Sequence, residues 1–212
     1  MPFGFTYSSG EDFLPIVKYD AKAGRISRID RVDGTSTTID ITRSFKAVFD
    51  FENLEVGWIS FIAGSAPSFH VAKYGEPMPA KPDDHHKQGV RILMKLGKEC
   101  GGDVREMASI ARAFMTGTGK LHEEYLRDAP ANPGKLPVVT LVDTVPEVTG
   151  SAEKKTTNYA PVWQITAWVP RPVDLHPLRR RRRAPRRSTQ DRDSPGMLRR
   201  CGGSARGSRA PQ

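Results

Sequence analysis

The 212-residue sequence has little cysteine and no long apolar run, and these two absences exclude several classes of protein. Its two cysteines, Cys100 and Cys201, are too few for a disulfide framework or a four-cysteine zinc site. No stretch approaches the roughly 18 apolar residues that a membrane-spanning helix needs. The N-terminal residues include acidic and polar side chains, unlike the apolar core of a signal peptide. We therefore expect a cytoplasmic protein with no membrane contact.

An excess of positive charge is confined to the end of the chain. The whole sequence has 33 basic and 24 acidic residues, a net charge of +9. Residues 175–212 hold twelve arginines and two aspartates, whereas residues 1–174 hold 21 basic and 22 acidic residues and have a net charge of −1. Only the tail therefore has the net positive charge that favours nucleic-acid binding.

The composition changes abruptly near residue 172. We expect one domain over residues 1–172 and a disordered, arginine-rich tail over residues 173–212, because almost no apolar side chains remain there. Such a tail would contact phosphate groups without sequence preference. A one-base slip of the reading frame in a GC-rich gene would also turn Pro and Ala codons into this mixture of Arg, Gly and Pro. The DNA sequence of the gene separates the two explanations.

Alternating patterns predict a domain that is mainly β. Residues 25–33 and 37–41, with Gly34 between them, predict a first hairpin. Residues 44–51 and 54–62 alternate clearly, and the short turn between them predicts a second antiparallel hairpin. The first of these two strands presents one apolar face, which we assign to the core: Phe45, Ala47, Phe49 and Phe51.

A long loop and a basic strand follow. Residues 64–84 are rich in Pro and Gly and predict a loop with a short strand near residues 69–72. Residues 88–97 predict a half-buried strand whose outer face carries Arg91 and Lys95.

The strongest helical pattern begins at Asp103, which with Glu106 has the spacing of a capping box. Apolar residues then recur at helical spacing as far as Met115. Residues 117–119 (GTG) should interrupt this helix, and residues 120–129 predict a second, shorter one.

Two last strands, at residues 138–142 and 161–169, flank a polar, turn-rich segment at residues 143–157. The order of elements predicts a mainly β protein with a helical insertion (α+β), compatible with an elaborated, OB-fold-like antiparallel barrel. A β-sandwich with a helical appendage has the same order of elements.

Several motifs suggest catalysis or ligand binding, but none is complete. Residues 117–120 (GTGK) lack the Ser or Thr that ends a phosphate-binding P-loop and do not follow a strand. Residues 83–86 (DDHH) carry metal-binding side chains, but neighbours in an extended segment point apart. Cys100 has no evident base as partner. No Gly-x-Ser-x-Gly motif surrounds Ser60, Ser65 or Ser68. We therefore expect no enzyme activity, no cofactor and no metal.

Aromatic and basic residues interleave along the predicted strands, as in proteins that bind single-stranded nucleic acid. Flat side chains stack on unpaired bases, while basic side chains follow the backbone. Most strand aromatics belong in a core, Trp163 among them, but Tyr159 and Trp168 are better candidates for exposure. The residues expected to bind single-stranded DNA are Lys46, Arg91, Lys95, Lys154, Lys155, Tyr159 and Trp168.

Three segments resemble small bacteriophage and prophage proteins of the single-stranded-DNA-binding type: residues 45–59 (FKAVFDFENLEVGWI), 86–97 (HKQGVRILMKLG) and 155–172 (KTTNYAPVWQITAWVPRP). The resemblance spans residues 17–172. It implies an OB-like fold, binding without strong sequence preference, and protection of single strands during phage replication or recombination in a bacterial host. We also expect a homo-oligomer, with replication or recombination proteins as further partners.

The chain departs from these proteins at its C-terminus. They commonly end in an acidic tip that recruits partners, whereas this chain ends in arginines. The balanced charge of residues 1–174 also favours an alternative hypothesis. In that hypothesis the protein is a β-rich phage structural or assembly protein that acts through protein–protein contacts.

Overall fold

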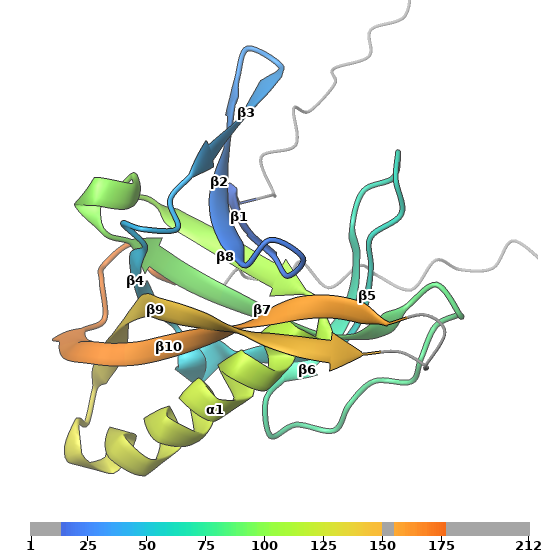
Figure 1. Ribbon diagram of the computed structural model, residues 1–212. Helices are drawn as coiled ribbons and strands as arrows, with labels where there is room; N and C mark the ends of the chain where they lie inside the picture. The colour runs from blue at the N-terminus through green and yellow to red at the C-terminus, as the bar shows by residue number, and fades with distance from the viewer. Residues whose placement is uncertain (1–13, 150–154, 177–212) are drawn as a thin grey trace, which may run out of the picture. The chain divides into compact units, whose positions relative to one another are not determined.

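A computed structural model describes residues 14–149 and 155–176. Within these ranges the chain forms ten strands and one α-helix, so the predicted mainly β class with a helical insertion is confirmed (Figure 1). Lys154 and the tail from residue 177 lie outside the described residues. The elements are β1 (Ile16–Asp20), β2 (Arg25–Val32), β3 (Thr35–Asp40), β4 (Lys46–Phe49), β5 (Glu55–Ser60), β6 (Ser68–Lys73), β7 (Lys87–Leu96), β8 (Val104–Ser109), α1 (Arg112–Asp128), β9 (Lys135–Thr149) and β10 (Thr156–Pro170).

The strands form one curled sheet. Its main path runs β10-β9-β4-β7-β8-β1-β2-β3, and β5 and β6 continue it beside β7. Neighbouring strands are antiparallel except β1 and β8, which are parallel. The sheet curls far enough that β10 meets the β1–β2 turn, where the Tyr159 N–H donates to the Ala21 carbonyl oxygen at 2.7 Å. The Tyr19 hydroxyl donates to the Tyr159 carbonyl oxygen, also at 2.7 Å, and so holds the half-barrel in its curled form.

The first predicted hairpin is confirmed as β2 and β3, which pair antiparallel. Its two-residue turn has positive φ at Asp33 (49°) and at Gly34 (77°). Two consecutive positive φ values are typical of the type I′ turn, whose twist matches that of the flanking strands. In Figure 1 this hairpin projects away from the rest of the sheet.

The second predicted hairpin is wrong. β4 and β5 do not pair with each other; both run antiparallel to β7, one after the other. The 3₁₀ turn Phe51–Asn53 lies between them and does not reverse the chain. A tight hairpin turn needs positive φ, and among the described non-glycine residues only Asp33 has it.

The helix predicted from Asp103 is wrong in its first half, because β8 occupies that segment and α1 begins at Arg112. Three alternate residues of β8 are buried: Arg105, Met107 and Ser109. Since two of them are polar, the strand does not show the apolar alternation by which strands are recognised in a sequence. The helical spacing of the apolar residues there was coincidental.

The interruption predicted at residues 117–119 is also absent, and α1 runs through it. Gly117 allows the helix to approach β10 closely. A Cβ atom at this position would lie 2.2 Å from the Pro161 carbonyl oxygen. The glycine therefore serves helix–strand packing rather than a turn.

The last two predicted strands are confirmed but are much longer than expected. β9 and β10 each have 15 residues and pair as one hairpin that includes most of the segment predicted as a loop. Thr and Val residues, which favour strands, outweigh the polar residues around them. Residues 150–154 lie outside the described part of the chain.

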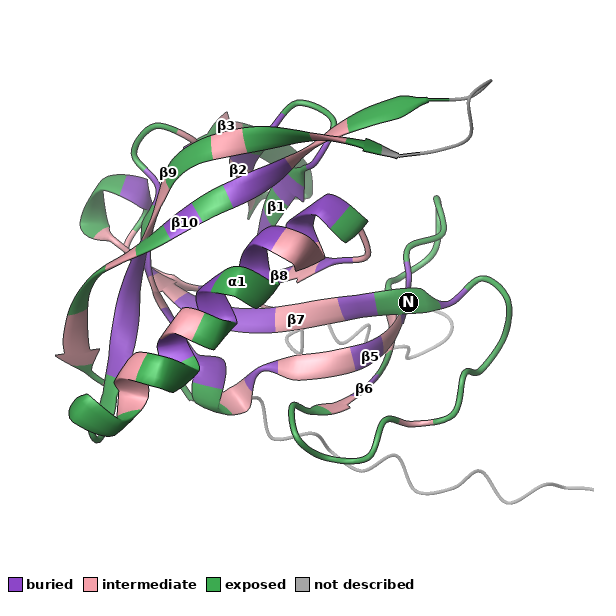
Figure 2. Cartoon of the chain, turned by 60° about the horizontal axis from the view of Figure 1, so that its bottom comes forward, coloured by how far each residue is buried: buried purple, intermediate pink, exposed green. Residues whose placement is uncertain are grey.

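The core lies between the concave side of the sheet and α1, which turns its buried residues toward the sheet (Figure 2). The predicted core residues of β4 and its flanks are confirmed as buried: Phe45, Ala47, Phe49 and Phe51. Trp163 is also confirmed as a core residue, with its ring centroid 5.8 Å from that of Phe49. Its indole N–H donates to Thr118 Oγ1 on α1 at 3.3 Å, so β10 and the helix are joined within the core.

Candidate nucleic-acid interface

Arg91, predicted to project into solvent, is held in the sheet. Its side chain is only 12% exposed, and it forms ion pairs with Glu106 and Glu55. The Nε–H donates to Glu106 Oε2 at 2.9 Å. The guanidinium carbon lies 4.7 Å from the centroid of the Phe69 ring. The expectation of an exposed Arg91 is therefore wrong, because neighbouring strands supply carboxylates that neutralise it.

Lys95, on the same face of β7, is half-buried and pairs with Asp174 from the segment that follows β10. The hydrogen bond from Lys95 lowers the pKa of the Asp174 carboxyl below its usual value. Leu175, beside it, is fully buried and packs with Leu93 and Leu136. The folded part of the chain thus continues past residue 172, and its last residues cover part of the expected basic face.

The same segment is anchored by Arg171. Its guanidinium donates to both carboxylate oxygens of Asp50 at 2.7 Å and to Glu52 Oε2 at 2.7 Å. Asp50 is fully buried and also accepts a hydrogen bond from the Asn53 amide at 2.9 Å. The hydrogen bonds to Asp50 raise the pKa of Arg171 further above its already high value. This cluster stabilises the end of the domain and engages both terminal nitrogens of Arg171.

The two aromatic residues predicted to stack on bases lie in different places. Tyr159 is half-buried at the β1–β2 turn. Trp168 is half-buried near the end of β10, where its ring stacks on Tyr125 of α1 with centroids 5.7 Å apart and planes 23° apart. Tyr125 also contacts His122, which touches the half-exposed ring of Tyr74. Trp168 thus belongs to an aromatic row along α1.

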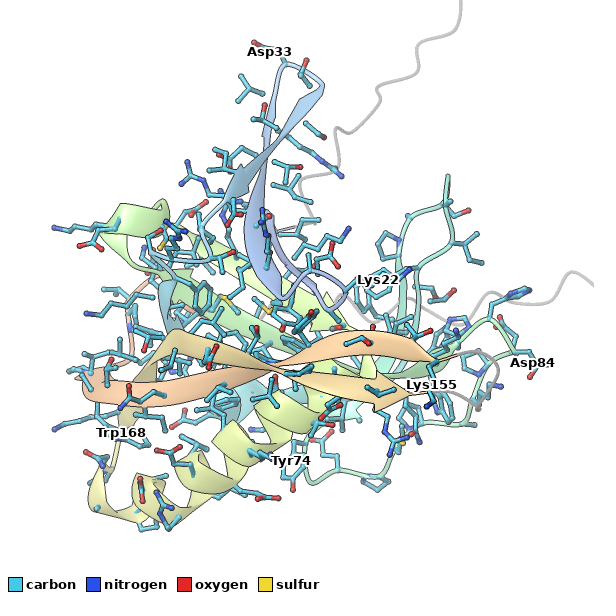
Figure 3. The ribbon with its side chains drawn as sticks, viewed as in Figure 1. Lys22, Asp33, Tyr74, Asp84, Lys155 and Trp168 are labelled. Atoms are coloured by element: carbon cyan, nitrogen blue, oxygen red, sulfur yellow. The ribbon has the colours of Figure 1, made fainter. Side chains whose placement is uncertain are left out.

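The described basic candidates do not gather with these rings. Lys46 and Lys155 are exposed. Lys155 and Trp168 lie at opposite ends of the β9–β10 hairpin (Figure 3). The structure therefore does not bring the predicted binding residues together on one face.

A cavity of about 860 Å³ lies on a different part of the sheet. Its walls come from β1, β2, β8 and the turn before β6. Three arginines are among the residues that line it: Arg28, Arg31 and Arg105. We call this cavity the arginine groove. Sequence reasoning missed it because its arginines come from strands that are distant in the sequence.

The charges of the arginine groove are largely paired. Arg105 donates to Asp103 at 2.9 and 3.0 Å and also pairs with Asp30. Burial lowers the pKa of Arg105, but the hydrogen bonds to the two aspartates outweigh burial and raise it. Arg28 Nη1 donates to the Cys100 carbonyl oxygen at 2.9 Å. Its Nε is buried without a hydrogen bond from any described residue, although it lies 3.2 Å from Asp30.

Arg31 differs from the other two arginines of the groove. It is exposed, and no ion pair joins it to another described residue. A ligand phosphate at the groove therefore has one exposed, unpaired guanidinium available to it, that of Arg31.

No helix in the described ranges is long and apolar enough to cross a membrane. Among residues 14–149 and 155–176, no group of three metal-binding side chains is placed to hold an ion, the 83–86 segment included. A scan against protein-family models, a search of the curated proteins and a search of solved structures each found no match. The resemblance to single-strand-binding phage proteins stays a prediction.

Proposed function

We propose that this protein binds single-stranded nucleic acid, with DNA as the expected ligand and without strong sequence preference. The observation that carries the proposal is the order of strands around the curled sheet. β4–β5, β7 and β8 lie side by side, α1 follows, and β9 and β10 return to the other side of β4. A Greek-key barrel of five strands with its helix after the third strand is the OB-fold. We infer an elaborated OB-fold to which β1, β2 and β3 are added beside β8.

The location of the arginine groove supports this inference. OB-folds bind oligonucleotides over their second and third strands and beside the loop that joins the first two. Here these strands are β7 and β8, and the loop that joins β5 to β7 spans residues 61–86 and contains β6. The groove is lined by residues of β8 and by Ser65–Pro67 of that loop. Its volume of about 860 Å³ lies within the range of roughly 300–1,000 Å³ that ligand sites occupy.

The proposal assigns the first phosphate contact to Arg31, because its charge is unpaired. Lys46 and Lys155, both exposed, stay predictions for contacts along the rest of the strand. Since most other groove charges are paired, the domain alone should bind with a shallow salt dependence. Each phosphate contact on a single strand contributes about 0.7 to the slope of log K against log salt.

Fluorescence anisotropy with a labelled oligothymidine tests the proposal. The protein is used both whole and truncated after Pro177, where the contacts within the chain divide into two units. The truncation is necessary because the arginine-rich tail would attract any polyanion. We expect the truncated protein to bind at low salt and Arg31→Glu to weaken that binding. Arg127→Glu, which changes an exposed arginine on α1, should leave it unchanged.

Two results would contradict the proposal. One is no binding of DNA or RNA by the truncated protein at low salt. The other is an equal loss of affinity in the two arginine variants, which would indicate a general charge effect rather than a groove.

A second function, assembly through protein–protein contacts, is favoured by one observation. Three valines of β9 are exposed: Val142 (59%), Val145 (49%) and Val148 (63%). Val145 and Val148 are three residues apart with no bulge between them, so both faces of the β9–β10 hairpin expose apolar side chains. Exposed apolar side chains often mark contact sites. If assembly is the function, Val145→Asp should dissociate the multimers that analytical sedimentation detects. Val32→Asp, on the β2–β3 hairpin, should leave them intact. A protein that stays monomeric at high concentration would remove this candidate.

A further inference from the structure

A serine, a histidine and an aspartate that are separated in the sequence come together where the long loop before β7 covers the β5–β6 pair. The Ser68 Oγ lies 3.1 Å from His86 Nε2, and His86 Nδ1 lies 2.7 Å from Asp83 Oδ1. We propose that these three side chains form a nucleophilic site at which Ser68 takes an acyl group from small activated esters. This activity is separate from nucleic-acid binding and uses none of the arginines of the groove.

The fold explains why these residues meet. Ser68 begins β6, and its side chain points to the same face of the hairpin as those of Trp58 and His70, according to the register. The loop is held over this face by the Trp58 indole N–H, which donates to the Pro79 carbonyl oxygen at 2.9 Å. The His86 ring packs edge-on against that of His70, with centroids 5.1 Å apart. His86 is therefore fixed over Ser68.

The hydrogen bonds around Asp83 determine which nitrogen of His86 carries the proton. Asp83 Oδ1 accepts the backbone N–H groups of His85 at 2.8 Å and of His86 at 3.2 Å. An ionised carboxylate can only accept, so the Nδ1 of His86 donates to it. In the neutral ring the lone pair then lies on Nε2, facing the Ser68 hydroxyl, as general-base catalysis requires. The same hydrogen bond from His86 lowers the pKa of Asp83 and keeps this carboxylate ionised.

Ser60 supplies a candidate donor for the developing oxyanion. It pairs with Ser68 in the β5–β6 register, so the two side chains point to the same face. Its hydroxyl is buried and has no hydrogen-bond partner among the described residues. An unsatisfied donor beside a nucleophile can stabilise negative charge on the oxygen of a tetrahedral intermediate.

The reaction has two balanced steps. Ser68 Oγ attacks the carbonyl carbon while His86 Nε2 takes the hydroxyl proton, and the C–O bond to the leaving group then breaks as His86 returns that proton to it. The products of this step are acyl-Ser68 and an alcohol or phenol. Water next attacks the acyl-serine, with His86 again accepting and returning a proton. The carboxylic acid leaves and Ser68 is restored.

The first test is covalent labelling of the full-length protein. The protein is incubated with a fluorophosphonate probe, and its peptides are examined by mass spectrometry. We expect the label on Ser68 and its loss in Ser68→Ala. Ser36→Ala, which changes an exposed serine on β3, is the matched control and should keep the label on Ser68. No label on Ser68, or equal labelling of exposed serines, would overturn the proposal.

The second test is hydrolysis of p-nitrophenyl acetate. His86→Gln and Asp83→Asn should each lower the rate by about 10²–10⁴-fold, the usual contribution of general-base catalysis. Their neighbours give matched controls, since His85→Gln and Asp84→Asn change exposed residues and should keep the rate.

Thermal melting of each variant shows whether the fold is intact. If a variant fails to fold, Ser68→Ala, which removes one oxygen atom, still decides the question. An unchanged hydrolysis rate in folded Ser68→Ala would overturn the proposal.

Discussion

Two glycines of α1 have contrasting surroundings, and replacing each by alanine tests how the helix is seated on the sheet. A Cβ at Gly117 would lie 2.2 Å from the Pro161 carbonyl oxygen and 2.8 Å from two atoms of its ring. A Cβ at Gly119 would meet no atom within 4 Å. Both positions are helical, so the pair differs in packing and not in backbone conformation.

The size of the effect follows from these distances. Alanine stabilises a helix by about 1 kcal/mol relative to glycine, and Gly119→Ala should show most of that gain. Gly117→Ala has the same gain in helix propensity. Its Cβ, however, would approach the Pro161 carbonyl oxygen more than about 1 Å closer than the usual contact distance of roughly 3.5 Å. The helix must then move away from β10, and overpacking of this kind costs about 1–3 kcal/mol. The two variants should therefore differ in free energy of unfolding by about 1–3 kcal/mol.

Urea denaturation followed by tryptophan fluorescence measures this difference, because Trp163 lies at the helix–strand contact. We expect the urea midpoint of Gly119→Ala to be higher than that of the wild type. The midpoint of Gly117→Ala should lie well below that of Gly119→Ala. Equal midpoints for the two variants would refute the close approach of Gly117 to Pro161. Such a result would favour the interruption of the helix that the sequence predicted at these glycines.

Three further predictions concern buried groups. Arg171→Ala leaves the buried Asp50 without its ion-pair partner and should cost roughly 3–5 kcal/mol of unfolding free energy, whereas Arg127→Ala, at an exposed pair, should leave the unfolding free energy nearly unchanged. Burial lowers the pKa of His122, so the folded state binds its proton less readily than the unfolded state; stability should fall as the pH drops below about 6.5, and His122→Gln should reduce that fall. Cys100 is fully buried, with its thiol donating to the Ser44 carbonyl oxygen at 2.7 Å, so residue-specific mass spectrometry should find it unmodified by iodoacetamide until urea unfolds the protein.

The sequence was informative where one face of a strand is entirely apolar. The alternation from Phe45 to Phe51 predicted the core face of β4, and Trp163 was assigned to the core for the same reason. The β2–β3 hairpin was found because Gly34 marks a turn whose geometry few residues adopt. In both cases the decisive interactions are local, or depend only on burial.

The sequence was misleading where polar residues are buried or where pairing is non-local. β8 buries Arg105 and Ser109 beside Met107, so its inward face does not look apolar. β4 and β5 follow each other along β7, and the buried Asp50 between them is satisfied by Asn53 and by Arg171, 121 positions away. No local rule of turn or strand chemistry contains that information.

The sequence was also insufficient to predict which charged residues of the candidate site are unpaired. Alternation placed Arg91 and Lys95 on the outer face of β7, and the register confirms that they share it. Alternation does not show which carboxylate pairs with each residue. Arg91 pairs with Glu106 from the next strand, and Lys95 pairs with Asp174 from beyond β10. A carboxylate beside a basic residue offsets the charge that the residue presents to a nucleic acid. For the domain without its tail, this shifts the expected electrostatic contact from β7 to Arg31 of the arginine groove.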